Sequence, residues 1–269
     1  TIKKNNFKCM EKKPHITERF KEKTTPFIRQ LAQTSKAVAD MYFYDHINEN
    51  IPVDYERDIL LEKSHSPTKG LVHKFSNSIA VFLSYTCAAN CRYCERQDRV
   101  GVGLDKQGLL NNIEIDNIIE YIKVHPNIRE VVLSGGDPLM NPKGLEYFCN
   151  KIALIDSVKT MRIHTKVPVQ APRLVNLELL ERIVQTKNAF YFSIHINHPD
   201  ELNPEVMETV NQIRKLGFIM LSQSVFLKGV NDSEDVLYAL FTSLSETGVR
   251  PYYIYHCQAI PTTKKFVMD

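Results

Sequence analysis

Apolar and polar positions alternate in two distinct rhythms after residue 70. Short runs rich in β-branched and aromatic residues are typical of buried strands. They predict strands at 79–84, 130–133, 160–164, 190–196, 218–226 and 251–256. The longer runs between them have the spacing of amphipathic helices and predict helices at 115–123, 142–155, 177–185, 204–216 and 233–245. Strands that alternate with helices predict a parallel sheet with right-handed crossovers.

Residues that favour helix ends stand near these boundaries. Four side chains can cap a helix N-terminus, namely Asp116, Asn141, Asn203 and Asp232. Pro142 and Pro204 suit the first helical turn, and Gly217 and Gly248 suit the position after the last one.

The first part of the chain has a different pattern. Residues 1–70 look mostly helical, with an amphipathic helix at 27–43. We therefore predict a helical N-terminal segment at 1–70 and an α/β core at 71–269. The alternation in the core fits either a closed or partly closed barrel or an open doubly wound sheet. In both folds, functional residues collect at the carboxyl ends of the strands.

Composition is ordinary for a globular protein, with 43% hydrophobic and 24% charged residues among 269. The net charge of +3 is too close to balance to indicate nucleic acid or a membrane surface as a partner. No apolar run reaches the ~18 residues of a membrane helix, and no signal peptide is visible. Six cysteines without a secretory signal favour a reducing compartment, so we expect a cytoplasmic protein.

Three of these cysteines lie within eight residues, directly after the first predicted strand. They are Cys87, Cys91 and Cys94. Three thiolates on a tight loop can bind three irons of a cubane and leave the fourth iron open to a small molecule. The alternative is a zinc site completed by a histidine such as His73. Structural zinc usually has a second cysteine pair, which the sequence lacks, so the spacing favours a 4Fe–4S cluster.

Polar residues also end the later predicted strands. Ser134, Gly135, Gly136 and Asp137 follow the second strand, where the glycines allow a ligand to approach the backbone and Asp137 adds an acceptor. A simple strand-to-helix turn would have the same residues. Histidines end the third and fourth strands, and a lone histidine on a strand is more often a core residue. Because such residues recur at successive strand ends, we expect one shared site there.

The cysteine spacing is the signature of the radical S-adenosylmethionine (radical SAM) superfamily. Taken together, the motifs resemble lysine 2,3-aminomutase and its relatives from about residue 70 to 257. The resemblance is carried by a C-x3-C-R-x-C-x-R loop, Leu-Ser-Gly-Gly-Asp, Asn-His-Pro, Gln-Ser-Val with Gly-Val-Asn-Asp, and Val-Arg-Pro-Tyr-Tyr-Ile-Tyr. It implies a partial (β/α)6 TIM-type barrel as the radical SAM core at 71–269.

The resemblance also implies three cofactors: a 4Fe–4S cluster, S-adenosylmethionine and pyridoxal phosphate. In this chemistry a 5′-deoxyadenosyl radical takes hydrogen from the β-carbon of an amino acid held as a pyridoxal-phosphate aldimine. The α-amino group then moves to the β-carbon. An electron donor such as flavodoxin or ferredoxin and a homo-oligomer are further expectations.

Matching positions suggest residue roles, although no residue is assigned to catalysis. The cluster ligands are Cys87, Cys91 and Cys94, and the methionine-binding loop is Ser134, Gly135, Gly136 and Asp137. His195 and Gln223 lie near the adenosyl group, and Lys74 lies near pyridoxal phosphate. The substrate contacts are Arg96, Asp232 and Gln258. Arg96 would grip the substrate carboxylate, with a surface ion pair as its alternative.

Several positions depart from the family pattern. Gln258 replaces the aspartate that selects lysine, and a neutral amide cannot balance a buried ammonium, so we expect a substrate other than plain lysine. Ser78 replaces an arginine of the phosphate pocket, and Lys166 stands where an arginine is usual. The family's pyridoxal-anchoring lysine follows the last strand in a glycine-rich segment, which we expect beyond Asp269; Lys264 and Lys265 lack that setting.

Three functions remain open. The first is an amino-acid 2,3-aminomutase acting on a small-molecule amino acid, with neither nucleic acid nor membrane as a partner. The second is a radical SAM enzyme of other chemistry without pyridoxal phosphate. The third, more remote, is a non-catalytic zinc or iron–sulfur binding module.

Overall fold

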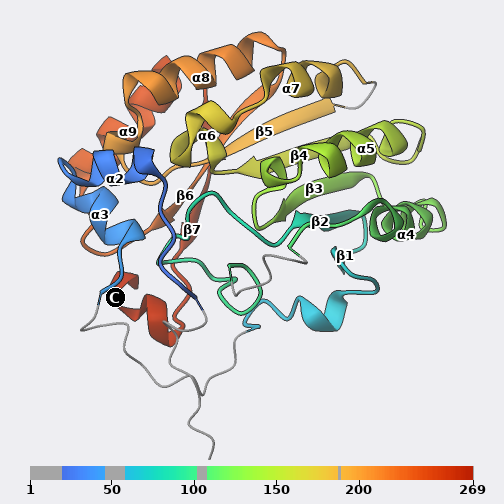
Figure 1. The fold of residues 1–269 in the computed structure, drawn as a ribbon, viewed down its shortest axis with the longest axis horizontal. Coiled ribbons are helices and arrows are strands. Elements are labelled where there is room, and N and C mark those ends of the chain that lie inside the picture. Colours follow the sequence, from blue (N-terminus) through green and yellow to red (C-terminus); the bar gives the residue numbers. More distant parts are fainter. Residues whose placement is uncertain (1–19, 46–57, 102–107, 187–188, 269) are drawn as a thin grey trace, which may run out of the picture.

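The computed structural model describes residues 20–45, 58–101, 108–186 and 189–268. Its centre is a sheet whose strands lie in sequence order (Figure 1). The strands are β1 (Leu71–Phe75), β2 (Ser78–Ser84), β3 (Glu130–Gly135), β4 (Thr160–Thr165), β5 (Ala189–His195), β6 (Ile219–Phe226) and β7 (Arg250–His256). β1 is antiparallel to β2, and all later neighbours are parallel. Within the described residues β1 and β7 do not pair, so the sheet is a partial barrel, and the predicted α/β class is confirmed.

Helices cover the outer face of the sheet (Figure 1). They are α4 (Asn112–Lys123), α5 (Pro142–Ile152), α7 (Leu177–Val184), α8 (Pro204–Lys215) and α9 (Glu234–Glu246). The remaining helices are α2 (Pro26–Ala32), α3 (Lys36–Tyr42) and the short α6 (Val167–Gln170). Short 3₁₀ helices are η1 (Lys63–His65), η2 (Pro138–Met140), η3 (Pro172–Leu174), η4 (Pro199–Glu201) and η5 (Pro261–Phe266).

The main core lies between the sheet and these outer helices. In β4, Met161 and Ile163 are fully buried and belong to one apolar cluster with Ile118 of α4 and Phe148 of α5. Each such side chain contributes about 1.5–3 kcal/mol on burial. Because successive side chains of a strand point to opposite faces, the residues between them face the inner side of the barrel. The inner face can therefore carry the polar groups of a site.

A second apolar cluster joins the N-terminal helices α2 and α3 to the cysteine loop and to the segments that follow β6 and β7. Met41 and Tyr42 of α3 pack there with Tyr93, Leu227 and Phe266, which come from three distant parts of the chain. Figure 1 accordingly shows α2 and α3 (blue) near the C-terminal segment (red). The N-terminal helices thus contact the loop that carries the cysteines.

All six predicted strands are confirmed, but β1 was not predicted. Its sequence, Leu-Val-His-Lys-Phe, becomes progressively more exposed along the strand and lacks a buried apolar run. The division of the chain at residue 70 stays a prediction, and residues 1–19 and 46–57 of that segment lie outside the described residues. The predicted helix at 27–43 is wrong in one respect: it is split into α2 and α3, because the Ser35 side chain accepts a hydrogen bond from Val38 N and starts a new helix.

Two of the four predicted helix caps are wrong. Asn141 and Asn203 cap α5 and α8 as predicted. The cap of α4 is Asn111 rather than Asp116, because Asn111 and Glu114 form a reciprocal capping box one turn earlier. The cap of α9 is Ser233 rather than Asp232. Asp232 instead accepts a hydrogen bond from Gly229 N in the preceding turn.

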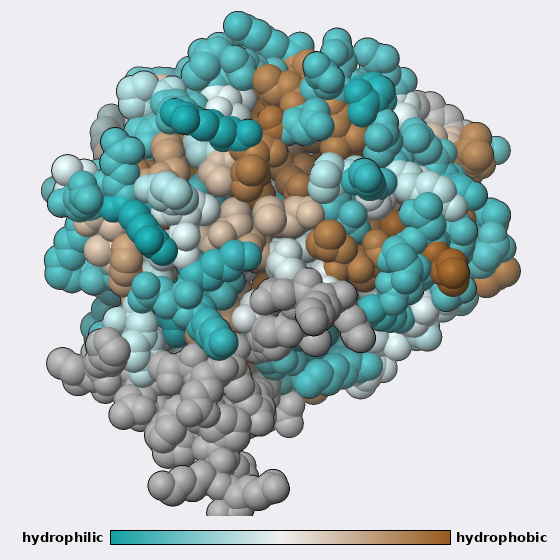
Figure 2. All heavy atoms as spheres, in the orientation of Figure 1, coloured by the Kyte–Doolittle hydropathy of each residue, from teal (hydrophilic) through white to brown (hydrophobic). Residues whose placement is uncertain are grey.

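The surface in the orientation of Figure 2 is largely hydrophilic, with hydrophobic residues visible between polar ones. Across the part of the chain that the structure describes, no helix combines the length and the apolar character needed to span a membrane.

Candidate active site

A cavity of about 600 Å³ lies at the carboxyl ends of the strands. Nearly all of the predicted site residues line it, although they come from six strands and their loops. They are Lys74, Cys87, Cys91, Cys94, Arg96, Ser134, Gly135, Gly136, Asp137, His195, Gln223 and Gln258. Asp232 is not among the lining residues. The shared site expected from the strand ends is therefore present.

The cysteine loop follows β2 and is held in place by contacts with the N-terminal segment. Arg92, between two of the cysteines, is fully buried. Its guanidinium lies 5.0 Å from the centre of the Phe20 ring and 5.7 Å from that of Tyr44, and its backbone N donates to Met41 O at 2.8 Å. Buried cation–π contacts of this kind stabilise by about 2 kcal/mol. The loop conformation thus depends on residues far away in the sequence.

All three cysteines are free thiols that line the cavity. Burial raises the pKa of each, that of Cys94 to about 12, and the neighbouring thiols raise it further for Cys87 and Cys94. In the part of the chain that is described, no three His, Cys, Asp or Glu side chains are grouped so as to hold a single metal ion.

The Ser-Gly-Gly-Asp loop is attached directly to the backbone of the cysteine loop. Gly136 N donates to Ser84 O and Asp137 N donates to Thr86 O, both at 2.8 Å. A Cβ at Gly136 would lie 2.5 Å from Thr86 O, so only glycine fits there. Gly135 has a φ of +99°, which also favours glycine. These contacts hold the two motifs at a fixed separation.

Asp137 ties the end of β3 to the end of β4. Its buried carboxylate accepts hydrogen bonds from Thr165 Oγ1 at 2.8 Å, Lys166 N at 2.8 Å, Val167 N at 3.2 Å and Leu139 N at 3.0 Å. Burial raises its pKa, and these donors act in the opposite direction. The carboxylate is largely occupied by protein donors, so contact with a methionine amino group stays a prediction.

Two histidines present unpaired nitrogens at the cavity. The Nε2 atoms of His164 and His195 are buried and have no hydrogen-bond partner within the described structure. Burial lowers the pKa of His164 to about 4 and that of His195 well below its usual value, so both rings are neutral near pH 7. Such nitrogens favour a polar ligand that completes their hydrogen bonding. His195 pairs in register with Gln223 of β6, and contact of either residue with an adenosyl group stays a prediction.

A buried ion pair closes one side of the cavity. Lys166 Nζ lies 2.7 Å from Glu201 Oε1, and the two side chains are 6% and 0% exposed. Glu201 Oε2 also accepts from Asn197 N at 2.7 Å. Lys166 lies 5.9 Å above both Tyr42 and Tyr93, and its charge lowers the pKa of Cys91 against the stronger effect of burial.

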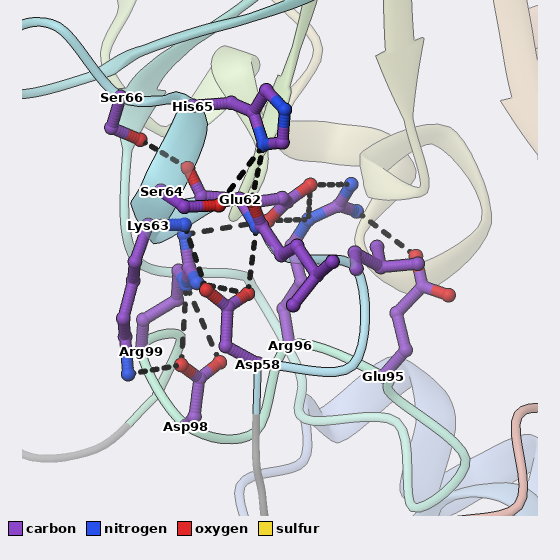
Figure 3. A network of polar contacts seen from close by, with 12 residues as sticks. Asp58, Glu62, Lys63, Ser64, His65, Ser66, Glu95, Arg96, Asp98 and Arg99 are labelled. Carbon is purple, nitrogen blue, oxygen red and sulfur yellow. Dashed lines mark hydrogen bonds and ion pairs between the residues drawn. The ribbon is translucent and has the colours of Figure 1, made fainter.

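Arg96 belongs to a network of charges that joins it to η1 and the residues before it (Figure 3). Its Nη2 lies 2.7 Å from Glu62 Oε1, and its Nε donates to both oxygens of Glu62 at 3.2 Å. Glu95 Oε1 lies 3.3 Å from Nη1. Burial opposes the charge, but Glu95 and Glu62 raise the pKa of Arg96 above its usual value. Arg96 is thus ion-paired within the protein and also lines the cavity, and its contact with a substrate carboxylate stays a prediction.

Residues 81–241 match the model of the radical SAM superfamily. The chain belongs to the radical SAM superfamily. This radical SAM chain is also 34% identical over 217 residues to L-lysine 2,3-aminomutase of Buchnera aphidicola, covering 80% of the chain and 63% of that protein. It is 32% identical over 210 residues to L-lysine 2,3-aminomutase of Escherichia coli, covering 78% and 60%. The resemblance to lysine 2,3-aminomutases is thereby confirmed. The chain spans roughly three fifths of the length of these relatives.

One solved structure with a similar fold is Streptococcus suis SuiB, crystallised with precursor peptide SuiA. Its TM-score is 0.55, with 14% identity, and the match covers 90% of this chain and 54% of SuiB. An identity this low supports the fold alone. The partial barrel is therefore the expected architecture of a radical SAM core.

The residues at the radical SAM motif fit an iron–sulfur cluster. Three half-buried thiols that share a cavity and have raised pKa values are costly to ionise without a nearby positive charge, and the irons of a cluster would provide that charge. Gly135 and Gly136 line the same cavity as the thiols and carry no side chain that would exclude a small chelating molecule. The site thus fits a 4Fe–4S cluster and S-adenosylmethionine.

The residues expected near pyridoxal phosphate fit that group less well. Ser78 Oγ donates to Glu130 Oε2 at 2.8 Å, and Glu130 also binds Arg162 at 2.7 Å. Lys74 Nζ donates to Leu60 O at 3.1 Å. The hydroxyl that replaces an arginine is thus committed to a carboxylate, which disfavours a phosphate at this position.

The sequence did not reveal two contributors to the site, Glu62 and Glu201. A local signal existed only for Glu201, which follows the Asn-His-Pro motif and forms a capping box with His198. Glu62 is separated from Arg96 by many residues, and no spacing rule connects them. The predicted role of Asp232 in substrate binding has no support from the cavity, because this residue lies in the turn after β6.

Proposed function

We propose that the protein is a radical SAM amino-acid 2,3-aminomutase, which moves an α-amino group to the adjacent β-carbon. The observation that carries the proposal is that Arg96 lines the same cavity as the three thiols and the Ser-Gly-Gly-Asp loop. A guanidinium suits the carboxylate of an amino acid, which would then lie close to S-adenosylmethionine. The relatives named L-lysine 2,3-aminomutase support this reaction class.

The chain's own residues bind and orient the reactants in this proposal. Cys87, Cys91 and Cys94 hold the cluster, and the backbone around Gly135 and Gly136 receives the methionine moiety. Bound there, the cluster would supply the electron that cleaves S-adenosylmethionine to the 5′-deoxyadenosyl radical. The unpaired Nε2 of His195 is available to the adenosyl group. The protein thus provides position, while the cofactors provide the difficult chemistry.

The proposed substrate is an amino acid other than plain lysine. Gln258 lines the cavity where a lysine-selective carboxylate would be needed. The nearby carboxylates of Glu62 and Asp137 already accept hydrogen bonds from protein donors. A second ammonium on the substrate would therefore lack a free counter-charge at these residues.

Pyridoxal phosphate as a second cofactor rests on the resemblance alone. The lysines that line the described cavity are Lys74 and Lys166, and Lys166 is ion-paired to Glu201. The Ser78–Glu130 hydrogen bond favours a second candidate function, a radical SAM enzyme of other chemistry without pyridoxal phosphate.

The proposal has further parts that the family suggests. We expect a cytoplasmic protein that takes electrons from a donor such as flavodoxin or ferredoxin and forms a homo-oligomer. Reduction of the cluster by each purified donor, and the mass of the protein in solution, test these expectations directly.

The decisive experiment uses the complete gene product, purified anaerobically and supplied with S-adenosylmethionine. Individual amino acids are tested for β-amino acid products, and borohydride trapping is followed by mass mapping of any modified lysine. A β-amino acid together with a pyridoxyl-lysine supports the aminomutase. The proposal would be contradicted if S-adenosylmethionine were cleaved to 5′-deoxyadenosine while no pyridoxal was trapped and no tested amino acid gave a β-amino acid. That outcome would favour the second candidate.

A further inference from the structure

Arg96 reaches the cavity with each of its guanidinium nitrogens next to a carboxylate of the protein (Figure 3). Glu62 accepts hydrogen bonds from Nε and Nη2, and the shortest of these is 2.7 Å. Glu95 lies beside the third nitrogen, Nη1, at 3.3 Å. Glu62 occupies the edge of the guanidinium formed by Nε and Nη2, so a ligand carboxylate that binds two nitrogens must approach the edge formed by Nη1 and Nη2, beside Glu95.

The two glutamates are held very differently. The Glu62 side chain is 8% exposed and also lies 3.4 Å from Arg99 Nη1. Its segment is fixed by Asp58, which accepts hydrogen bonds from Glu62 N at 3.0 Å, Lys63 N at 2.7 Å and Arg99 Nη2 at 2.8 Å. Breaking such a buried network is strongly unfavourable.

Glu95, by contrast, is 35% exposed, and its distance from Arg96 is longer than the shortest Glu62 contact. Partly exposed ion pairs contribute little to stability, so this pair can be exchanged at small cost. The Phe82 ring lies 5.3 Å from the guanidinium carbon and helps to fix its plane. Arg96 therefore keeps its orientation when Glu95 moves away.

We infer that Glu62 is a positioning residue for Arg96 and that Glu95 is an internal competitor, which a ligand carboxylate replaces at Nη1. The inference deepens the proposed function and rests on it in one respect: the ligand of Arg96 is a carboxylate. It adds a specific direction of approach, since only the Nη1 side of the guanidinium is exchangeable. By competing for Nη1, Glu95 lowers the affinity with which a ligand carboxylate binds Arg96.

The test measures carboxylate binding at Arg96 without any turnover. Full-length protein with its cluster is treated with phenylglyoxal, and the modification of Arg96 is followed by peptide mass mapping as acetate is added. In Glu95→Gln, acetate should protect Arg96 with an affinity about two- to five-fold higher than in wild type. In Glu62→Gln, protection should weaken about ten-fold or more, because the guanidinium is no longer held. Glu181→Gln, an exposed glutamate of α7, should match wild type.

A purely structural role of Glu62 is tested with Asp58→Asn. This variant weakens the same network through Asp58, which anchors the segment without contacting Arg96 in the network described. Retained protection of Arg96 in Asp58→Asn, with loss in Glu62→Gln, supports a positioning role. Equal loss in both variants overturns it.

Failure of this inference is distinguishable from failure of the proposed function. Suppose that no β-amino acid forms, but acetate protects Arg96 more tightly in Glu95→Gln and more weakly in Glu62→Gln than in wild type. The reaction is then a different one, and the inference stands. If acetate protects Arg96 equally in wild type and Glu95→Gln, or in neither, the inference is overturned whatever the protein catalyses.

Discussion

Lys166 and Glu201 lie 2.7 Å apart with almost no exposed surface, so each is the counter-charge that the other needs. Burial disfavours both charged forms, and only their attraction and the backbone donors to Glu201 compensate for it. Arg96 and Glu62, which also line the cavity, form a second such pair at 2.7 Å. At the scale of residues, the cavity wall is thus made of charges that are paired within the protein before any ligand arrives.

Replacing Glu201 with Gln should leave Lys166 buried without a counter-charge. We expect a loss of about 3–5 kcal/mol in the free energy of unfolding, measured by urea denaturation under anaerobic conditions. The control is Glu205→Gln, which removes an exposed pair with Arg173 and should change stability by less than about 1 kcal/mol. Similar small losses in both variants would show that Lys166 is solvated or paired elsewhere.

Removal of a single motif thiol should abolish the cluster. In Cys91→Ala, iron and sulfide content should fall to background, and 5′-deoxyadenosine should no longer form from S-adenosylmethionine. Cys149→Ala is the matched control, because Cys149 is a buried free thiol of α5 in the main core. It should keep its iron. Continued deoxyadenosine formation in Cys91→Ala would refute the role of the motif.

At the scale of elements, the site depends on how two loops are fastened together. The loop after β3 is hydrogen-bonded to the loop after β2 through Gly136 N and Asp137 N, and Asp137 continues the connection to β4. Three neighbouring strand ends therefore behave as one unit. A substitution that moves any of these loops should displace groups at the other two.

Gly136→Ala tests this connection. Its Cβ would meet backbone atoms of Thr86 at 2.5–2.6 Å, so the loops must separate. We expect a stability loss of about 1–3 kcal/mol and at least a roughly ten-fold weaker affinity for S-adenosylmethionine, measured by equilibrium dialysis. Gly229→Ala is the control: it has a φ of +75° with open space around it, and it should cost about 1 kcal/mol without affecting the affinity. Unchanged affinity in Gly136→Ala would mean that the ligand does not approach this loop.

The whole molecule combines features that the sequence predicts well with others that it does not encode locally. The parallel strands β2 to β6 carry buried apolar residues, which is why they and their shared edge were predictable. β7 is exposed along nearly its whole length and was predicted from its run of aromatic and β-branched residues. β1 was not predicted, because His73 and Lys74 interrupt its short apolar run. The pairing of Arg96 with Glu62, like that of Lys166 with Glu201, depends on contacts between separate segments. These long-range charge pairs arise only from the three-dimensional fold.

Neutral histidines buried in the barrel should make global stability depend on pH. The folded pKa of His164 is about 4, below its unfolded value near 6.5, so the unfolded chain binds more protons between these values. The contribution of neutral His164 to the free energy of unfolding should therefore be fully present above about pH 6.5. It should decrease by about 3 kcal/mol as the pH falls toward 4. Urea denaturation of wild type and His164→Asn at several pH values measures the difference. An identical pH dependence in both proteins would contradict the prediction.

The burial of Arg92 between Phe20 and Tyr44 has a consequence for the order in which the protein matures. Residues 20–45 are synthesised well before two of their apolar partners, Leu227 and Phe266, which lie far later in the sequence. Contacts between such distant segments form late in folding. The packing behind the cysteine loop is therefore completed only after Leu227 and Phe266 have been synthesised.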